Sequence, residues 1–116
     1  MSERSDRDCL RDIQEAVRRI EAYISGMSYK TFGGDTKTQD AVTRNLEVIG
    51  EATKNLSAEL RAQYSDIPWR SMAGVRDRLI HHYFGINLDV VWHMITAELP
   101  QVALQIAKII GDEKVS

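Results

Sequence analysis

The chain has 116 residues, of which 43% are hydrophobic and 28% charged, and its formal net charge is −2. This length suits one domain over residues 1–116, and the composition excludes a disordered or fibrous protein. The slight negative charge argues against a protein that coats nucleic acid by bulk attraction, so RNA binding would require a local basic patch.

The cysteine content and the hydropathy pattern indicate a compartment. Cys9 is the only cysteine, so no internal disulfide can form and a secreted, disulfide-stabilised fold is not expected. The first residues are too charged for a signal peptide, and no apolar run reaches membrane-spanning length. We therefore expect a cytoplasmic protein.

The first predicted element is an amphipathic helix that ends near Gly26. Its apolar residues are spaced three and four apart, as on one face of an α-helix: Leu10, Ile13, Val17, Ile20 and Ile24. The stretch from Ser28 to Gly34 contains two adjacent glycines and is predicted to be a loop.

A second helix is predicted to start at Asp35 or Thr36. Thr36 and Gln39 have the spacing of a capping box, in which each side chain bonds the other's backbone N–H. The apolar face of this helix comprises Val42, Leu46, Ile49 and Leu56. Gly50 interrupts the pattern at a cost in helix stability, which predicts a close approach by another helix there.

The remaining elements follow a break at residues 64–68. Pro68 suits the first turn of a third helix, which should run to Gly85. Asn87 is placed to cap a fourth helix, and Pro100 should kink or divide it. Because no alternating strand pattern or internal repeat occurs, we predict an all-α fold, a four-helix up-down bundle with a kinked or divided last helix.

The sequence lacks the usual metal and cofactor motifs. It has no Cys-x-x-Cys, no His-Glu-x-x-His, no phosphate-binding glycine loop and no serine elbow. A metal site of His81, His82 and His93 is not favoured, because adjacent histidines on a helix point about 100° apart. We therefore expect neither a metal nor a cofactor.

Arg76 is the first residue of chemical interest. It falls on the predicted apolar face of the third helix, and Tyr83 lies about 20° from it around the axis. A guanidinium on a buried face needs a partner that compensates for its lost hydration. That partner is either a carboxylate of the second helix, Glu47 or Glu51, or the phosphate of a ligand, which the planar guanidinium binds through two oxygens.

Asp77 and His81 are four residues apart, so the carboxylate can orient the imidazole and raise its pKa. The alternative is that His81 is an ordinary surface histidine. His81 lies about 140° from Arg76 around the helix, so a single helix does not aim both side chains at one point. Two copies that face each other across a two-fold axis could do so, which favours a homodimer.

The other notable side chains are given structural roles. Arg78 and His82 fall on a third face of the helix and are predicted to be solvated. His93 is interpreted as a packing or surface histidine, and Trp69 and Trp92 as core residues rather than platforms for stacked bases.

The spacing Arg76-x4-His81-x-Tyr83 resembles the motif of HepT-like toxins, a branch of the HEPN ribonuclease superfamily. The resemblance extends to the flanking segments and covers essentially the whole chain: residues 67–70, 83–85 and 91–92, and residues 45–52 of the second helix. Many family members have Asn after the arginine, where this chain has Asp77.

The resemblance implies the toxin of a type VII toxin–antitoxin system. Such a protein is a homodimeric bundle that cleaves RNA without a metal in a cleft at the dimer interface. It implies Arg76 and His81 as catalytic residues, with Asp77 supporting them. It also implies a minimal nucleotidyltransferase antitoxin of the MntA type, which silences the toxin by transferring AMP to Tyr83.

Two other readings stay open from the sequence. The chain could be a non-catalytic helical binding module that is the subunit and modification target of a nucleotidyltransferase. It could also be a purely structural dimer in which Arg76 pairs with Glu51.

Overall fold

The computed structural model describes residues 4–79 and 85–112 of the chain. Within these two ranges the chain forms helices joined by turns and short loops, and no β-strand occurs there. The predicted all-α class is therefore confirmed. None of the helices described is long and apolar enough to cross a membrane.

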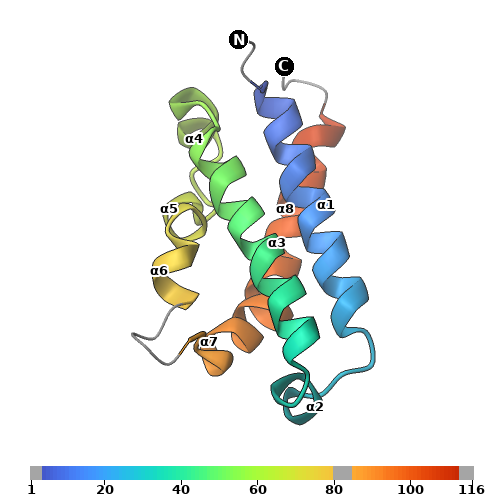
Figure 1. Ribbon diagram of the computed structural model, residues 1–116. Coiled ribbons are helices and arrows are strands. Elements are labelled where there is room, and N and C mark those ends of the chain that lie inside the picture. Colours follow the sequence, from blue (N-terminus) through green and yellow to red (C-terminus); the bar gives the residue numbers. More distant parts are fainter. Residues whose placement is uncertain (1–3, 80–84, 113–116) are drawn as a thin grey trace.

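Three long helices form the body of the molecule (Figure 1): α1 (Asp6–Ile24), α3 (Thr36–Lys54) and α8 (Leu99–Gly111). Helix α1 packs along α3 and also contacts α8. Short helices complete the fold: α2 (Tyr29–Gly33), α4 (Ala58–Gln63), α5 (Trp69–Ala73), α6 (Val75–Leu79), α7 (Leu88–His93) and the π-helical segment η2 (Met94–Glu98). Helices α5 and α6 lie against α3, on the side away from α1.

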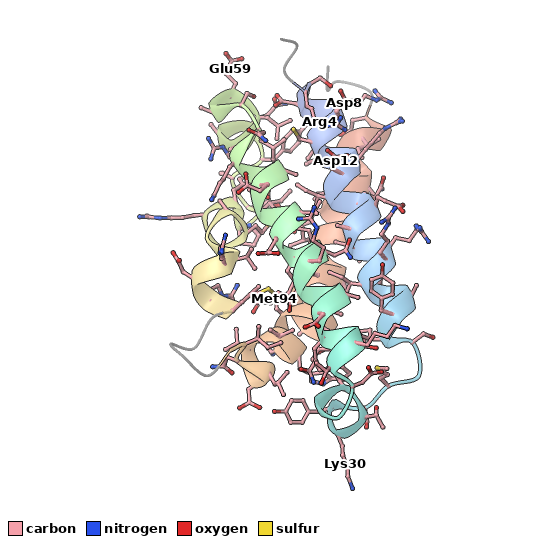
Figure 2. The ribbon with its side chains drawn as sticks, in the orientation of Figure 1. Arg4, Asp8, Asp12, Lys30, Glu59 and Met94 are labelled. Carbon is pink, nitrogen blue, oxygen red and sulfur yellow. The ribbon has the colours of Figure 1, made fainter. Side chains whose placement is uncertain are left out.

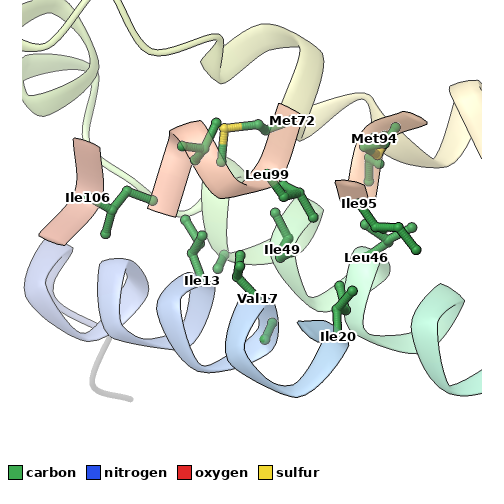
Figure 3. Packing of buried hydrophobic residues seen from close by; sticks show 14 of the residues in the cluster. Ile13, Val17, Ile20, Leu46, Ile49, Met72, Met94, Ile95, Leu99 and Ile106 are labelled. Atoms are coloured by element: carbon green, nitrogen blue, oxygen red, sulfur yellow. The ribbon is translucent and has the colours of Figure 1, made fainter. Parts of the chain in front are cut away.

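The core lies between these helices and is built from their apolar faces (Figure 3). Helix α1 contributes Ile13, Val17 and Ile20, and α3 contributes Leu46 and Ile49, all of them buried. Buried side chains of α5, η2 and α8 close the core from the other side: Met72, Met94, Ile95, Leu99 and Ile106. Burial of these faces supplies the main driving force for folding.

Helix α1 agrees with its prediction. Ser5 caps it in a capping box, because its Oγ accepts a hydrogen bond from the Asp8 N–H (3.1 Å) while the Asp8 carboxylate accepts one from the Ser5 N–H (3.4 Å). The helix ends at Ile24, and Gly26 follows with a φ of +78°, a conformation that glycine adopts without steric cost.

The predicted loop at residues 28–34 is wrong, because Tyr29–Gly33 forms the short helix α2. Ser28 caps it: its Oγ accepts from the Thr31 N–H (3.2 Å), and the Thr31 hydroxyl accepts from the Ser28 N–H (2.8 Å). Phe32 is fully buried and anchors the turn in the core.

The predicted Thr36–Gln39 capping box is also wrong. Asp35 caps α3 instead, since its carboxylate accepts from the backbone N–H of Thr38 (3.0 Å) and from its hydroxyl (2.8 Å). The Gln39 amide donates to the carbonyl of Phe32 (2.8 Å) and so links α3 to α2.

Gly50 is the point of close approach that its position predicted. A Cβ built there would lie 2.9 Å from Val75 Cγ1 and 3.4 Å from the Met72 carbonyl oxygen. The missing side chain allows α5 and the start of α6 to press against α3.

The third helix is not continuous as predicted. It is divided at Gly74 into α5 and α6, and Val75 and Leu79 form the buried side of α6. The predicted apolar face through Trp69 and Arg76 therefore does not exist, and Arg76 is exposed. Because the regular helix is interrupted at Gly74, the residues of α6 do not continue the three-four spacing of α5. Spacing counted from Trp69 therefore does not predict which residues of α6 are buried.

The last predicted helix is capped by Asn87, whose Oδ1 accepts from the Val90 N–H (3.2 Å). The prediction that this helix is kinked or divided is confirmed, since α7, η2 and α8 follow one another with a π-helical turn just before Pro100. Pro100 has no N–H to donate, and a local change of helix type is a common accommodation.

Candidate functional site

Only part of the predicted motif lies in the described chain. Arg76 and Asp77 are on α6, and both are exposed. His81, His82 and Tyr83 fall in residues 80–84, outside the described residues. The orientation of His81 by Asp77, and the meeting of Arg76 with His81 and Tyr83, therefore remain predictions.

The residues on either side of 80–84 are held together. The carbonyl of Leu79, the last residue of α6, accepts a hydrogen bond from the Asn87 N–H (2.7 Å). Leu79 is buried, and Gly85 has a φ of +84°. Leu79 and Asn87, which stand on either side of this segment in the sequence, are thus joined by a direct backbone hydrogen bond.

Arg76 lines a pocket of about 190 Å3 between α6 and α3. The α3 wall consists mainly of charged residues: Arg44, Glu47, Glu51 and Lys54. Among the described residues, Arg76 forms no hydrogen bond and no ion pair, although Glu47 and Glu51 line the same pocket. The ion pair considered from the sequence is therefore not formed, and the guanidinium is accessible to a ligand.

The prediction that Arg78 is solvated is wrong. Its two terminal nitrogens donate to the Glu98 carboxylate oxygens at 3.0 and 2.9 Å, and Nη1 also donates to Ser71 Oγ at 2.7 Å. Hydrogen bonding to Arg78 lowers the pKa of Glu98, and the same bonds raise the pKa of Arg78.

This bidentate pair fixes the orientation of α6. Residues two apart on an α-helix point about 200° apart. With Arg78 held toward η2 by Glu98, Arg76 is left on the side of α6 that faces α3 and its pocket. Arg78 and Arg76 therefore lie on different sides of α6.

Helix α7, which follows the motif, is held by aromatic contacts. The Trp92 ring lies 5.2 Å from the Phe32 ring and 6.2 Å from the Tyr29 ring, centroid to centroid. The Tyr29 hydroxyl donates to the Asp89 carboxylate, and this bond raises the pKa of Tyr29. These contacts tie α7 to α2.

Trp69 is buried as predicted, Trp92 is only partly buried, and His93 is a surface residue. Trp69 is buried, and its Nε1 donates to the Tyr64 carbonyl (3.0 Å). Trp92 is half-buried against the core. His93 is exposed, with its Nε2 3.6 Å from Glu98 Oε2, as expected of a surface histidine.

Within residues 4–79 and 85–112, no group of three or more histidine, cysteine or acidic side chains could hold a metal ion. His81 and His82 lie outside these ranges, so the expected absence of a metal site in the motif is not tested.

The sequence placed Glu47 and Glu51 opposite Arg76, but its interpretation missed the two cations of the α3 wall, Arg44 and Lys54. Arg44, Glu47, Glu51 and Lys54 follow a three-four-three spacing, which places them on one face of a helix. That spacing was a usable signal. The role of this charged face, however, depends on the residues packed opposite it, and the structure shows that these belong to α5 and α6.

Three cations and two carboxylates line this pocket. A guanidinium or an ammonium group can bind phosphate oxygens through charge-assisted hydrogen bonds, whereas the carboxylates repel them.

Comparisons with known proteins give the family of the chain. The model of the family described as "Ribonuclease HepT-like" matches residues 13–109. A "Putative RNase" of Methanocaldococcus jannaschii is 43% identical over 97% of this chain and 93% of its own. A "Probable ribonuclease HepT" of Thermococcus cleftensis is 42% identical, over 91% of this chain and 96% of its own. No solved structure gives a significant match.

Proposed function

Because this chain belongs to the HepT-like ribonuclease family and is thereby an endoribonuclease, we propose that it is the toxin of a toxin–antitoxin pair and cleaves RNA without a metal ion. The observation that carries the proposal is the Arg76 pocket. The guanidinium is exposed, is bonded to no other described residue, and lies where two further cations line the surface.

The proposed chemistry divides the reaction between two side chains. RNA cleavage needs a base to take the 2′-hydroxyl proton, an acid to protonate the leaving oxygen, and charge stabilisation at phosphorus. Histidine is the side chain best suited to proton transfer near neutral pH, and His81 is proposed to act as base or acid. Arg76 binds the phosphate and stabilises its developing charge, and Asp77 supports His81.

We propose that the active form is a homodimer of four-helix bundles, with the catalytic cleft shared between two copies. One chain carries one Arg76 and one His81, and a two-fold axis would bring two pairs together. The exposure of Arg76 and Asp77 on α6 is compatible with such a cleft.

The test is cleavage of RNA by the purified, unmodified protein in EDTA. Arg76→Ala and His81→Ala should each reduce cleavage by about 100-fold or more, because each removes a catalytic group. Helix content, followed by circular dichroism, should be unchanged. The wild type should sediment as a dimer at micromolar concentration.

His82→Ala is the matched control and should retain most of the activity. A stable monomer that cleaves RNA would contradict the shared cleft. Loss of cleavage in EDTA that a divalent ion restores would contradict the metal-free mechanism. No cleavage by the wild type would leave the non-catalytic binding module as the better reading.

Regulation is proposed to act on Tyr83. An MntA-type nucleotidyltransferase would transfer AMP from ATP to the phenol oxygen, forming a phosphodiester and releasing pyrophosphate. The added phosphate brings negative charge that competes with RNA for Arg76. Gene context is the first check, since the gene for such an enzyme should be adjacent to the gene for this chain.

Intact-mass measurement tests this regulation directly. After incubation with the partner and ATP, the wild type should gain the mass of one or more AMP groups and lose cleavage. Tyr83→Phe should keep much of its cleavage and gain no mass. Mass increments that persist in Tyr83→Phe would place the modification elsewhere.

A further inference from the structure

Helix α3 presents a charged face to the Arg76 pocket, formed by Arg44, Glu47, Glu51 and Lys54. At 100° per residue these four side chains fall within a band of about 80°. At 1.5 Å per residue, Arg44 and Lys54 are separated by about 15 Å along the helix. The face is therefore an elongated strip with a cation at each end.

Arg76 lies opposite the middle of this strip. Gly50, between the two glutamates in the sequence, is where α3 touches Val75, and Arg76 is the next residue on α6. The pocket is thus lined by three cations, Arg44 and Lys54 from the two ends of this face and Arg76 from α6, together with the carboxylates of Glu47 and Glu51.

The ion pairing on this face leaves its cations available. The Lys54 ammonium lies 3.7 Å from the Glu51 carboxylate, and both side chains are well exposed, at 58% and 73%. An exposed pair of this kind contributes little and exchanges readily with other partners. Arg44 is also exposed, and it forms no ion pair with another described residue.

We propose that Arg44 and Lys54 are positioning residues that bind RNA phosphates on the two sides of the phosphate held by Arg76. This inference rests on the proposed function, since it takes RNA as the substrate. A strand laid along α3 meets cations at both ends and at the centre. The carboxylates of Glu47 and Glu51 repel phosphates, so the phosphate contacts are confined to the three cations.

The first experiment measures binding apart from chemistry. A fully 2′-O-methylated RNA oligonucleotide lacks the 2′-hydroxyl needed for cleavage, so its affinity can be measured by fluorescence anisotropy at several salt concentrations. Arg44→Ala and Lys54→Ala should each weaken binding. Each should also reduce the slope of log K against log salt by about 0.7, the value for one lost phosphate contact on a single strand.

Matched controls separate position from charge. Lys30 lies in α2, at one end of the molecule, and its side chain points away from the body (Figure 2). Lys30→Ala removes this ammonium group and should leave the slope unchanged. Arg11→Ala, on the outer surface of α1, should do the same. Arg44→Lys and Lys54→Arg keep the charge and should retain the slope, which a purely structural role of these residues would not predict.

The second experiment measures cleavage of unmodified RNA by the same variants. Arg44→Ala and Lys54→Ala should raise KM with little change in kcat, since they bind substrate outside the reacting phosphate. If a variant loses helix content, Arg44→Gln or Lys54→Gln replaces it.

The outcomes distinguish the two proposals. Cleavage that depends on Arg76, with KM and salt slope unchanged in both alanine variants, would overturn the positioning role alone. Slopes that fall equally in the Lys30 and Arg11 controls would also overturn it. Absence of cleavage by the wild type would overturn the proposed function, while the methylated oligonucleotide would still report whether this face binds RNA.

Discussion

Gly50 acts through the side chain that it lacks. A methyl group there would lie 2.9 Å from Val75 Cγ1, and valine cannot easily turn away because its χ1 angle is restricted. The substitution Gly50→Ala should therefore overpack this contact, at a cost of about 1–3 kcal/mol. The higher helix propensity of alanine returns at most about 1 kcal/mol, so the net effect is destabilising.

Urea denaturation measures this effect. Gly33→Ala is the matched control, because no atom lies within 4 Å of a Cβ built at Gly33. It should be neutral or stabilise by up to about 1 kcal/mol. Because Val75 precedes Arg76, Gly50→Ala should also lower RNA cleavage under conditions where the protein stays folded. Equal stabilities of the two variants would show that the contact at Gly50 tolerates a methyl group.

At the same scale, the site was only partly predictable. The sequence singled out Arg76 and Asp77, but it placed Arg76 on a buried helix face, whereas its side chain is exposed on α6. The partner of Arg78 could not be predicted, because Glu98 is twenty residues away and on a different element. Nor did the spacing reveal that Glu47 and Glu51 line the pocket without pairing with Arg76.

At the scale of elements, one ion pair joins α6 to η2. Arg78 holds Glu98 through two hydrogen bonds, and both side chains are one-third exposed. The pKa of Glu98 is therefore below its ordinary value of 4.5 in the folded state. A carboxyl group with a lowered folded pKa stabilises the protein above its unfolded pKa, and this contribution is lost as the pH falls through the folded value.

Glu98→Gln should accordingly destabilise the protein at pH 7 by about 1 kcal/mol, a value reduced by the partial exposure of the pair. The difference in free energy of unfolding between wild type and variant should shrink as the pH falls below 4.5. Denaturation at a series of pH values checks this. Glu21→Gln, on the exposed side of α1, is the control for loss of one negative charge. A difference that stays constant down to pH 3 would mean that the ion pair does not contribute to stability.

The helices also differ in how far their position can be predicted from their own residues. The long helices α1, α3 and α8 have 13 to 19 residues, enough turns for an apolar periodicity to be read. Helices α2, α4 and α5 have only five or six residues. Helices this short are not stable alone, so their caps and their packing against the long helices decide where they form.

At the scale of the whole molecule, the net charge of −2 gives no general attraction for RNA. Specific binding must then come from a local arrangement of cations. The Arg76 pocket supplies one by bringing Arg44 and Lys54 of α3 to the same surface as a residue of α6. The proposed homodimer would place two such pockets in one assembly.

Local sequence patterns were enough to predict the all-α class, the long helices and the close approach at Gly50, and they carried the resemblance to a ribonuclease family. These features depend on local periodicity, on single residues, or on a motif whose spacing survives in the chain. Only the folded structure shows the break at Gly74, the bond between Arg78 and Glu98, and the exposed position of Arg76 in a pocket with Arg44 and Lys54. Each of these depends on which residues meet across elements far apart in the sequence, and no local pattern encodes that meeting.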